Sequence, residues 1–150
     1  MHALRRIHGS LRTEGMLVDL HPQPEHAGLE VWQGGRVKRL GHTEQEEDIR
    51  DILEARASLD LVVTDGWYLP KRQRFFDLLS HFPTPESWLE YQAREGYSSA
   101  VSEELLATAN RWLATGGGEF VVREPIRASL LERLPRSGSD DERPRFGALP

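Results

Sequence analysis

One stretch near the amino end, residues 4–22, restricts the fold more than any other part of the sequence. Three apolar residues lie at the spacing of one helix face: Leu4, Ile7 and Leu11. Gly15 follows and readily takes the left-handed conformation that ends helices. Residues 16–20 (MLVDL) then form an apolar run long enough for a buried strand. The order helix, glycine turn and core strand is typical of α/β folds.

The end of this expected strand is a predicted ligand site. We expect His21 and Pro22 to stop the strand, so that Asp19 and His21 lie near its carboxyl end. Open α/β sheets usually bind ligands at the carboxyl ends of their strands. Asp19 and His21 are therefore candidate substrate-binding residues.

The same residues leave a metal site as a second hypothesis. His21, Glu25 and His26 are of the types that bind zinc or iron. A metal site also needs converging ligands and supporting hydrogen bonds, which spacing alone does not show. We therefore expect residues 21–28, with two prolines and a glycine, to be a solvated loop without a metal.

Residues 4–20 resemble a segment of the class I S-adenosylmethionine-dependent methyltransferases, in which a helix and an LRPGG turn lead into the fifth strand. The turn here reads LRTEG, so Thr13 and Glu14 replace the proline and the first glycine. The order of expected elements up to about Leu134 is similar to the end of that fold. The resemblance implies an α/β chain with a partial Rossmann-like methyltransferase sheet, made of the final strands and an antiparallel end, with flanking helices and a small β-hairpin.

The resemblance places the cofactor on a half of the sheet that this sequence does not show. In the family, S-adenosylmethionine lies on a glycine-rich loop after the first strand, near an acidic residue that ends the second. The glycine cluster at residues 116–118 follows an expected helix and precedes an expected strand, which is the reverse order, and is expected to end the helix. We expect this chain alone to bind no cofactor, and S-adenosylmethionine only with a missing amino-terminal half.

The family's strand order also predicts a partner. It inserts the final strand between the fifth and sixth, antiparallel to both, which would join residues 16–20 to residues 119–127. The other edge of strand 16–20 would then have no neighbour, and an apolar edge with free backbone groups favours association. We expect a homodimer, or a separate chain that supplies the first half, to pair through this edge.

Composition limits the remaining classes of function. The chain has 150 residues, enough for one domain over residues 1–134, followed by a polar segment, residues 135–150, expected to be a disordered tail. It has no cysteine, which excludes disulfides and thiol nucleophiles. Its net charge of −5 argues against nucleic-acid binding, and no apolar run is long enough for a membrane span, so we expect a cytoplasmic location.

Local signals predict the elements that follow. Residues 29–41 read as a β-hairpin around Gly34 and Gly35, either covering a substrate pocket or forming an edge protected by its basic residues. Thr43 and Glu46 predict a capping box for a helix over residues 43–56. Residues 59–69 read as an extended run because β-branched and aromatic residues are frequent there.

Residues 73–82 carry conflicting signals. Their apolar positions fit one helix face, whereas the family resemblance asks for an antiparallel strand that pairs back with the preceding strand. We favour the strand, because the region of Pro70 suits the corner of a hairpin. Trp67 and Tyr68 would lie on opposite faces of the preceding strand, so only one could face a core. The other is a candidate substrate-binding residue that stacks on a ligand, with ordinary packing on the sheet as the alternative.

Residues that start or end helices are easy to identify in the carboxyl-terminal half. Thr84 and Gly96 predict the ends of one helix, and Ser102 predicts the start of another. Residues 119–134 resemble the family's final strand, with Pro125 marking a bulge or an edge.

Two functions follow. One is a methyltransferase-like, substrate-side half that is not catalytically competent alone. The alternative is a non-catalytic α/β module that binds a small ligand or another protein.

Overall fold

The computed structural model describes residues 2–44, 46–97 and 99–135, and leaves out the side chains of residues 2 and 46–48. Within this part the chain is an α/β protein with four helices and a five-stranded antiparallel sheet. The elements are α1 (His2–Ser10), β1 (Met16–Pro22), β2 (Gly28–Gln33), β3 (Arg36–His42), α2 (Glu46–Thr64), β4 (Tyr68–Phe82), α3 (Pro85–Glu95), α4 (Glu103–Ala114) and β5 (Glu119–Arg133). Residues 136–150, most of the segment expected to be a disordered tail, lie outside the described residues.

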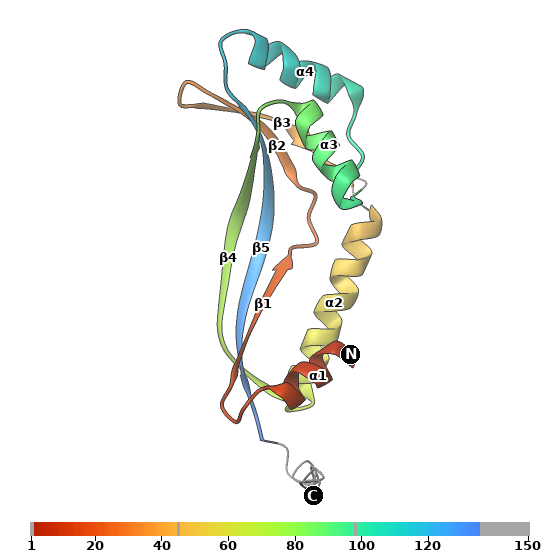
Figure 1. Ribbon diagram of the computed structural model, residues 1–150, viewed down its shortest axis with the longest axis vertical. Coiled ribbons are helices and arrows are strands. Elements are labelled where there is room, and N and C mark those ends of the chain that lie inside the picture. The colour runs from red at the N-terminus through yellow and green to blue at the C-terminus, as the bar shows by residue number, and fades with distance from the viewer. Residues whose placement is uncertain (1, 45, 98, 136–150) are drawn as a thin grey trace, which may run out of the picture.

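Strand β5 is the centre of the sheet (Figure 1). β4 pairs with β5 along its whole length, with Tyr68 opposite Arg133 at one end. The other edge of β5 is shared between two strands, because β1 pairs with residues 126–132 and β2 with residues 119–123. β3 pairs with β2. Since β1 and β4 are both antiparallel to β5, they run parallel to each other on its two sides.

The position of β5 between β1 and β4 is the order that the resemblance implies, but the register differs. Residues 16–20 lie opposite residues 128–132, because β2 occupies the first part of the β5 edge. The expected pairing with residues 119–127 is therefore wrong. His21 and Pro22 also continue β1 rather than ending it.

Pro125 lies at the break between β1 and β2. β4 passes it without a register shift, so it marks no bulge in that ladder. The carbonyl oxygen of Pro125 accepts a hydrogen bond of 2.7 Å from the backbone nitrogen of Gln23. The N–H and C=O of a strand residue point to the same side, so the missing N–H of Pro125 faces the same break. A proline is tolerated in this central strand because no ladder donor is needed there.

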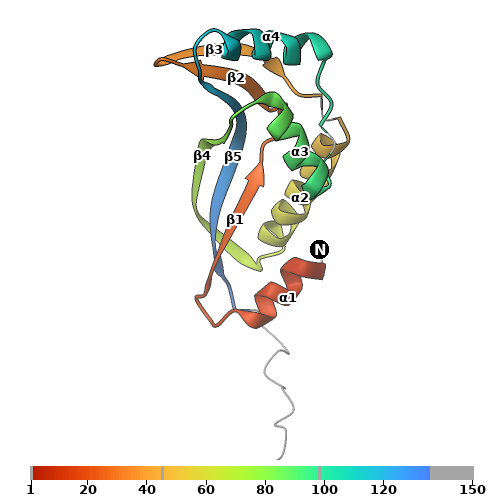
Figure 2. The ribbon, with the colours of Figure 1, turned by 45° about the horizontal axis from the view of Figure 1, so that its top comes forward.

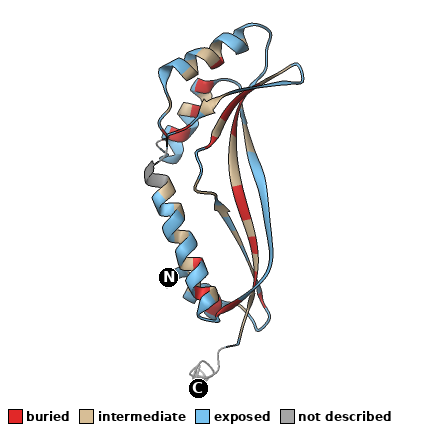
Figure 3. Cartoon of the chain, turned by 180° about the vertical axis from the view of Figure 1, so that it is seen from behind, coloured by how far each residue is buried: buried red, intermediate tan, exposed pale blue. Residues whose placement is uncertain are grey.

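All four helices lie on one side of the sheet, as Figures 1 and 2 show. One core cluster lies under α3 and α4, where Trp88 and Ala109 pack with Phe120 and Val122. A second cluster lies at the other end of the molecule, where Leu59 and Val62 of α2 pack with four residues from elsewhere in the chain: Leu4, Trp67, Tyr68 and Leu131. Figure 3 shows that many residues of β5 are buried, whereas most residues of β4 are exposed to solvent.

Helix α2 is longer than the sequence suggests. It runs from Glu46 to Thr64, and residues 65–67 form a turn before β4, so the expectation of an extended run is wrong over residues 59–67. Leu59 and Val62 are buried on its inner face. Strand propensity is weak where a helix buries the same β-branched residues against a core, and here packing decides the outcome.

Two predicted turn details at the amino-terminal side also differ. α2 begins at Glu46, and the buried Thr43 Oγ1 has no hydrogen-bond partner among the described residues. The other half of the predicted capping box, the side chain of Glu46, lies outside the described residues. The turn before β1 places its positive φ, 61°, on Glu14 rather than Gly15. Gly15 instead allows the backbone to pass close to Arg12, because a Cβ at residue 15 would lie 2.7 Å from the carbonyl oxygen of Arg12.

Residues 73–82 are a strand, as expected, but they belong to one continuous strand, β4, which runs from Tyr68 to Phe82 and pairs with β5. The expected hairpin corner near Pro70 and the pairing of residues 73–82 with the preceding strand are therefore wrong.

The predicted helix ends in the second half of the chain and the hairpin are confirmed. Thr84 forms a capping box with Ser87 at the start of α3, and Gly96 ends it with φ 77°. Ser102 caps α4. The hairpin turns at glycines 34 and 35, whose φ values are 55° and 75°, and its basic residues lie on the exposed edge strand β3.

Candidate functional site

A cavity of about 510 Å³ lies at the carboxyl ends of the parallel strands β1 and β4. The sheet contributes apolar side chains to its lining, including Leu78, Phe82 and Val122. Helices α2 and α3 and the segments beside them contribute the rest, with the Trp88 ring buried in the lining. Small-molecule sites have this size, and they combine an apolar lining with a few polar groups.

Polar groups line this cavity as well as apolar ones. Glu124 of β5 is half-buried in the lining, and burial raises the pKa of its carboxyl group. Gln92 of α3 and Thr43, which precedes α2, are buried there as well. The Thr43 hydroxyl has no hydrogen-bond partner among the described residues. The cavity therefore presents hydrogen-bonding groups to a ligand from two sides.

The predicted pair Asp19 and His21 lies beside this cavity rather than in its lining. His21 Nδ1 and Asp19 Oδ1 are 3.1 Å apart. On the other side, Asp19 Oδ2 lies 4.0 Å from Nη2 of the buried Arg127. The next residue, Pro22, does line the cavity. The structure thus brings Asp19 and His21 together and places Arg127, which the sequence did not suggest, beside Asp19.

Trp67 and Tyr68 lie together in the second core cluster. The structure buries both rings, with 8% and 1% of their surface exposed, so the expectation that only one faces a core is wrong. Tyr68 donates its hydroxyl hydrogen to the carbonyl oxygen of Leu4, and burial raises its pKa. His8 packs edge-on against both rings. Neither ring lines the large cavity.

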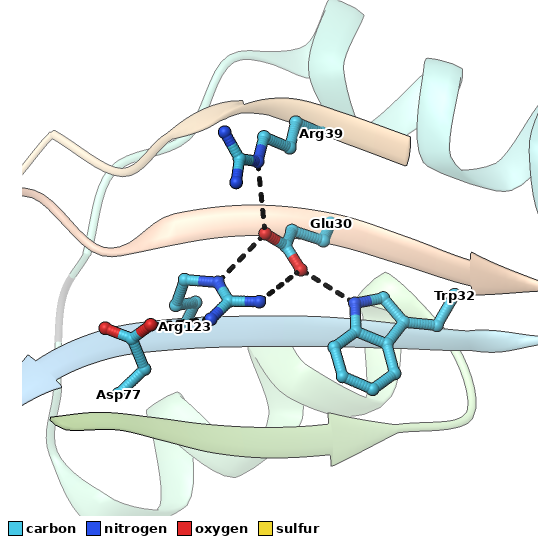
Figure 4. A network of polar contacts seen from close by, with 5 residues as sticks. All are labelled: Glu30, Trp32, Arg39, Asp77 and Arg123. Carbon is cyan, nitrogen blue, oxygen red and sulfur yellow. Dashed lines mark hydrogen bonds and ion pairs between the residues drawn. The ribbon is translucent and has the colours of Figure 1, made fainter. Parts of the chain in front are cut away.

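A second polar cluster links four strands of the sheet (Figure 4). Glu30 of β2 is 2% exposed and accepts hydrogen bonds from Arg123 Nε at 2.9 Å and Nη2 at 3.1 Å. Trp32 Nε1 donates to the same carboxylate at 2.7 Å, and Arg39 Nε lies 3.8 Å away. Arg123 also donates to Asp77 of β4 at 2.6 Å.

This cluster stabilises the sheet by joining neighbouring strands, and we call it the Glu30 cluster. Hydrogen bonds from Arg123 are the main reason that the pKa of Glu30 is lowered, and Glu30 in turn raises the pKa of Arg123. Both carboxylate oxygens of Glu30 already accept hydrogen bonds, so the group is poorly placed to take a proton from a substrate.

Sequence reasoning missed Glu30, Glu124 and Arg127. A signal for the last two was present, because the apolar run of the final strand is interrupted by charged residues within FVVREPIRASLL. Charged side chains in a central strand are almost never fully buried without a partner or a function. Glu30 gave no such signal, since alternation assigned it to a solvent-facing position.

Two other kinds of site are not found in the part of the chain that the structure describes. No group of three or more His, Asp or Glu side chains there could hold a metal ion, and His21, Glu25 and His26 form no such group. None of the helices described is long and apolar enough to cross a membrane.

Comparison with known proteins adds no assignment. No protein-family model, curated protein or solved structure matches the chain. Its function is therefore inferred from its own residues.

Proposed function

We propose that this chain is the substrate-side portion of a class I S-adenosylmethionine-dependent methyltransferase, and that its cavity between β1, β4 and the helices binds a small-molecule methyl acceptor. The strand order is the observation that carries the proposal. β5 lies between two mutually parallel strands and is antiparallel to both, as in the end of the methyltransferase sheet. The cavity lies at the carboxyl ends of those parallel strands, where α/β sheets bind ligands.

The described residues do not fit S-adenosylmethionine itself. The glycines at 116–118 link α4 to β5, which is not the strand–loop–helix order that points N–H groups at a ligand. An added Cβ at Gly118 would lie 2.6 Å from the carbonyl oxygen of Trp32, so this glycine allows close packing against β2. In the proposed arrangement this chain supplies the acceptor cavity, and another polypeptide segment supplies the cofactor loop.

The edge of β1 is the proposed junction with a partner. β1 pairs with β5 on one side and with no other strand of the described residues. Met16, Val18 and Leu20 are 43%, 62% and 62% exposed on one face of this strand. β1 carries no lysine or arginine, the residues that most often prevent edge pairing. In the isolated chain we expect this edge to pair with a second copy, and in a complete enzyme with a strand of the cofactor-binding half.

A dye-binding experiment tests the cavity. The dye 8-anilinonaphthalene-1-sulfonate binds apolar pockets, and Trp88 in the lining reports its arrival by energy transfer. Ser80→Phe introduces a large ring into the lining and should abolish saturable binding. Arg74→Phe adds the same ring at an exposed position of the same strand and should not. Equal loss of binding in both variants, or in neither, would contradict a ligand cavity at this place.

Calorimetry tests the division between the two halves. The isolated chain should give no binding heat with S-adenosylmethionine, and binding by this chain alone would contradict the proposal. The genomic DNA upstream of the Met1 codon should encode a strand, a glycine-rich loop and a helix. That segment and this chain, produced together, should bind the cofactor.

The second candidate function is a small-ligand-binding module in the cytoplasm that has no catalytic role. Two observations favour this second function. Both carboxylate oxygens of the buried Glu30 already accept hydrogen bonds, and the described residues contain no cofactor loop. It predicts dye binding in the large cavity, self-association, and no upstream cofactor-binding segment. That combination of results would replace the methyltransferase proposal.

A further inference from the structure

A second, separate cavity of about 360 Å³ lies between the end of α2, the start of β4 and the middle of β5. Leu59 and Val63 of α2 form one apolar side, and Leu131 of β5 lies opposite. Arg127 and the buried Ser129 contribute polar groups from β5. The cavity is large enough for a small organic molecule.

Arg127 is the unusual group in this lining. Arg127 is only 3% exposed, and its Nε and Nη2 atoms have no hydrogen-bond partner in the described part of the chain. A buried guanidinium without hydrogen bonds is costly, because the loss of water is not compensated. Nε and Nη2 lie on the same edge of the guanidinium, and their N–H groups point in parallel. This is the edge that binds a carboxylate with two hydrogen bonds.

The same strand shows what this edge does when a carboxylate is present. Arg123, four residues earlier in β5, donates from Nε and Nη2 to the two oxygens of Glu30. Arg127 is more buried than Arg123. Its nearest carboxylate, Asp19, lies 4.0 Å away and is shared with His21.

Arg127 is the buried cation of this cavity. Two exposed cations, Lys71 and Arg72, also belong to the lining, and Lys71 is paired with Glu132 at 2.8 Å. Asp60 lines the cavity as well, and its negative charge disfavours a second negative charge on a ligand. The two-donor edge of Arg127 matches the two oxygens of a single carboxylate.

We propose that this cavity binds a small monocarboxylate with a short apolar tail. The carboxylate accepts hydrogen bonds from Nε and Nη2 of Arg127, and the tail packs against Leu59, Val63 and Leu131. This inference does not depend on the methyltransferase proposal, because it concerns a different cavity and different residues.

Titration calorimetry with hexanoate as the probe tests the proposal directly. Hexanoate should bind with one site per chain. Hexanol, which has the same tail without the charge, and hexyl phosphate, which carries up to two charges, should each bind at least about tenfold more weakly. No hexanoate binding, hexanol binding as tight as hexanoate, or tighter binding of hexyl phosphate would overturn the assignment.

Variants locate the binding on Arg127. Arg127→Met keeps the length and apolar volume of the side chain and should weaken hexanoate binding at least about tenfold. Arg133→Met is the matched control, since Arg133 lies on the same strand and also has a buried Nε without a partner, but it does not line the cavity. Asp19→Asn removes the competing carboxylate and should tighten binding by a few-fold. If Asp19→Asn weakens hexanoate binding or leaves it unchanged, Arg127 does not hold the carboxylate, and the proposal is overturned.

A further variant keeps the test independent of the arginine's role in folding. Val63→Phe narrows the cavity from the α2 side and leaves Arg127 in place. It should abolish hexanoate binding without changing dye binding in the larger cavity. Unchanged hexanoate binding in a folded Val63→Phe variant would place the ligand elsewhere and overturn the proposal.

Discussion

Glu30 and Glu124 lie in the same sheet, but their surroundings shift their pKa values in opposite directions. Hydrogen bonds from Arg123 are the largest cause of the lowered pKa of Glu30. Glu124 has no such donor to offset its burial, which raises its pKa. The difference separates a carboxylate that holds strands together from a carboxyl group available in a cavity.

Replacing Glu30 should weaken the fold at neutral pH. Glu30→Gln leaves Arg123 without its main charge partner in a buried position, and we expect the free energy of unfolding to fall by about 3 kcal/mol at pH 7. The lowered pKa means that the stability from Glu30 is present above its ordinary value of 4.5 and is lost as the pH falls through the lowered pKa. Urea denaturation at several pH values measures both effects.

The control for that experiment is Glu90→Gln, at an exposed position of α3. It should leave stability and its pH dependence unchanged. If Glu30→Gln costs no more than this control, Glu30 does not clamp the sheet.

Replacing Glu124 should raise the stability of the fold at neutral pH, whereas replacing Glu30 should lower it. Its raised pKa favours the neutral form in the folded protein, so its contribution to stability is full below the ordinary value of 4.5 and is lost as the pH rises through the raised pKa. Glu124→Gln should therefore be more stable than the native chain at pH 7, by about 1 kcal/mol, and equally stable in acid. Thermal unfolding at pH 4 and pH 7 measures the difference, and a variant less stable at pH 7 would contradict it.

Among the elements, those set by local signals were predictable and those set by distant partners were not. Thr84, Gly96 and Ser102 end or begin their helices as expected, because caps depend on residues within one turn. The length of α2 and the register of β1 depend on packing against residues more than sixty positions away. No local pattern contains that information.

The connection from α4 to β5 depends on a glycine for space. Gly118→Ala would place its Cβ 2.6 Å from the carbonyl oxygen of Trp32, at a φ of 155° that also disfavours a side chain. We expect a loss of about 2 kcal/mol in the free energy of unfolding. Gly9→Ala in α1 meets no atom within 4 Å and should be neutral or stabilising. Equal effects of the two changes in urea denaturation would argue against close packing at Gly118.

For the whole molecule, the α/β class and the position of β5 between β1 and β4 could be predicted, whereas the pairing of β2 with β5 and the cavities could not. The large cavity is assembled from side chains of β4, β5, α2 and α3 that lie far apart in the sequence. Asp19 lies in the middle of β1 and His21 close to its end, and the pairing of β1 with β5 brings Arg127 beside them.

Three strands have an open edge in the described residues, β1, β3 and β4, and they differ in charge. β3 carries Arg36, Lys38 and Arg39. β4 exposes Phe75 and Phe76, but Lys71, Arg72 and Arg74 interrupt its apolar surface. β1 has no basic residue and exposes Val18 and Leu20. We therefore expect β1, rather than β4, to be the edge that completes the sheet.

The molar mass of the isolated chain, measured by size-exclusion chromatography with light scattering from micromolar to millimolar concentration, tests this account most directly. We predict a concentration-dependent dimer that is lost in the double variant Val18→Lys, Leu20→Lys. Val37→Lys, at an exposed position of the edge strand β3, should leave the dimer intact. A monomer at every concentration, or a dimer that survives the β1 variant, would contradict the claim that this chain is part of a sheet completed through β1.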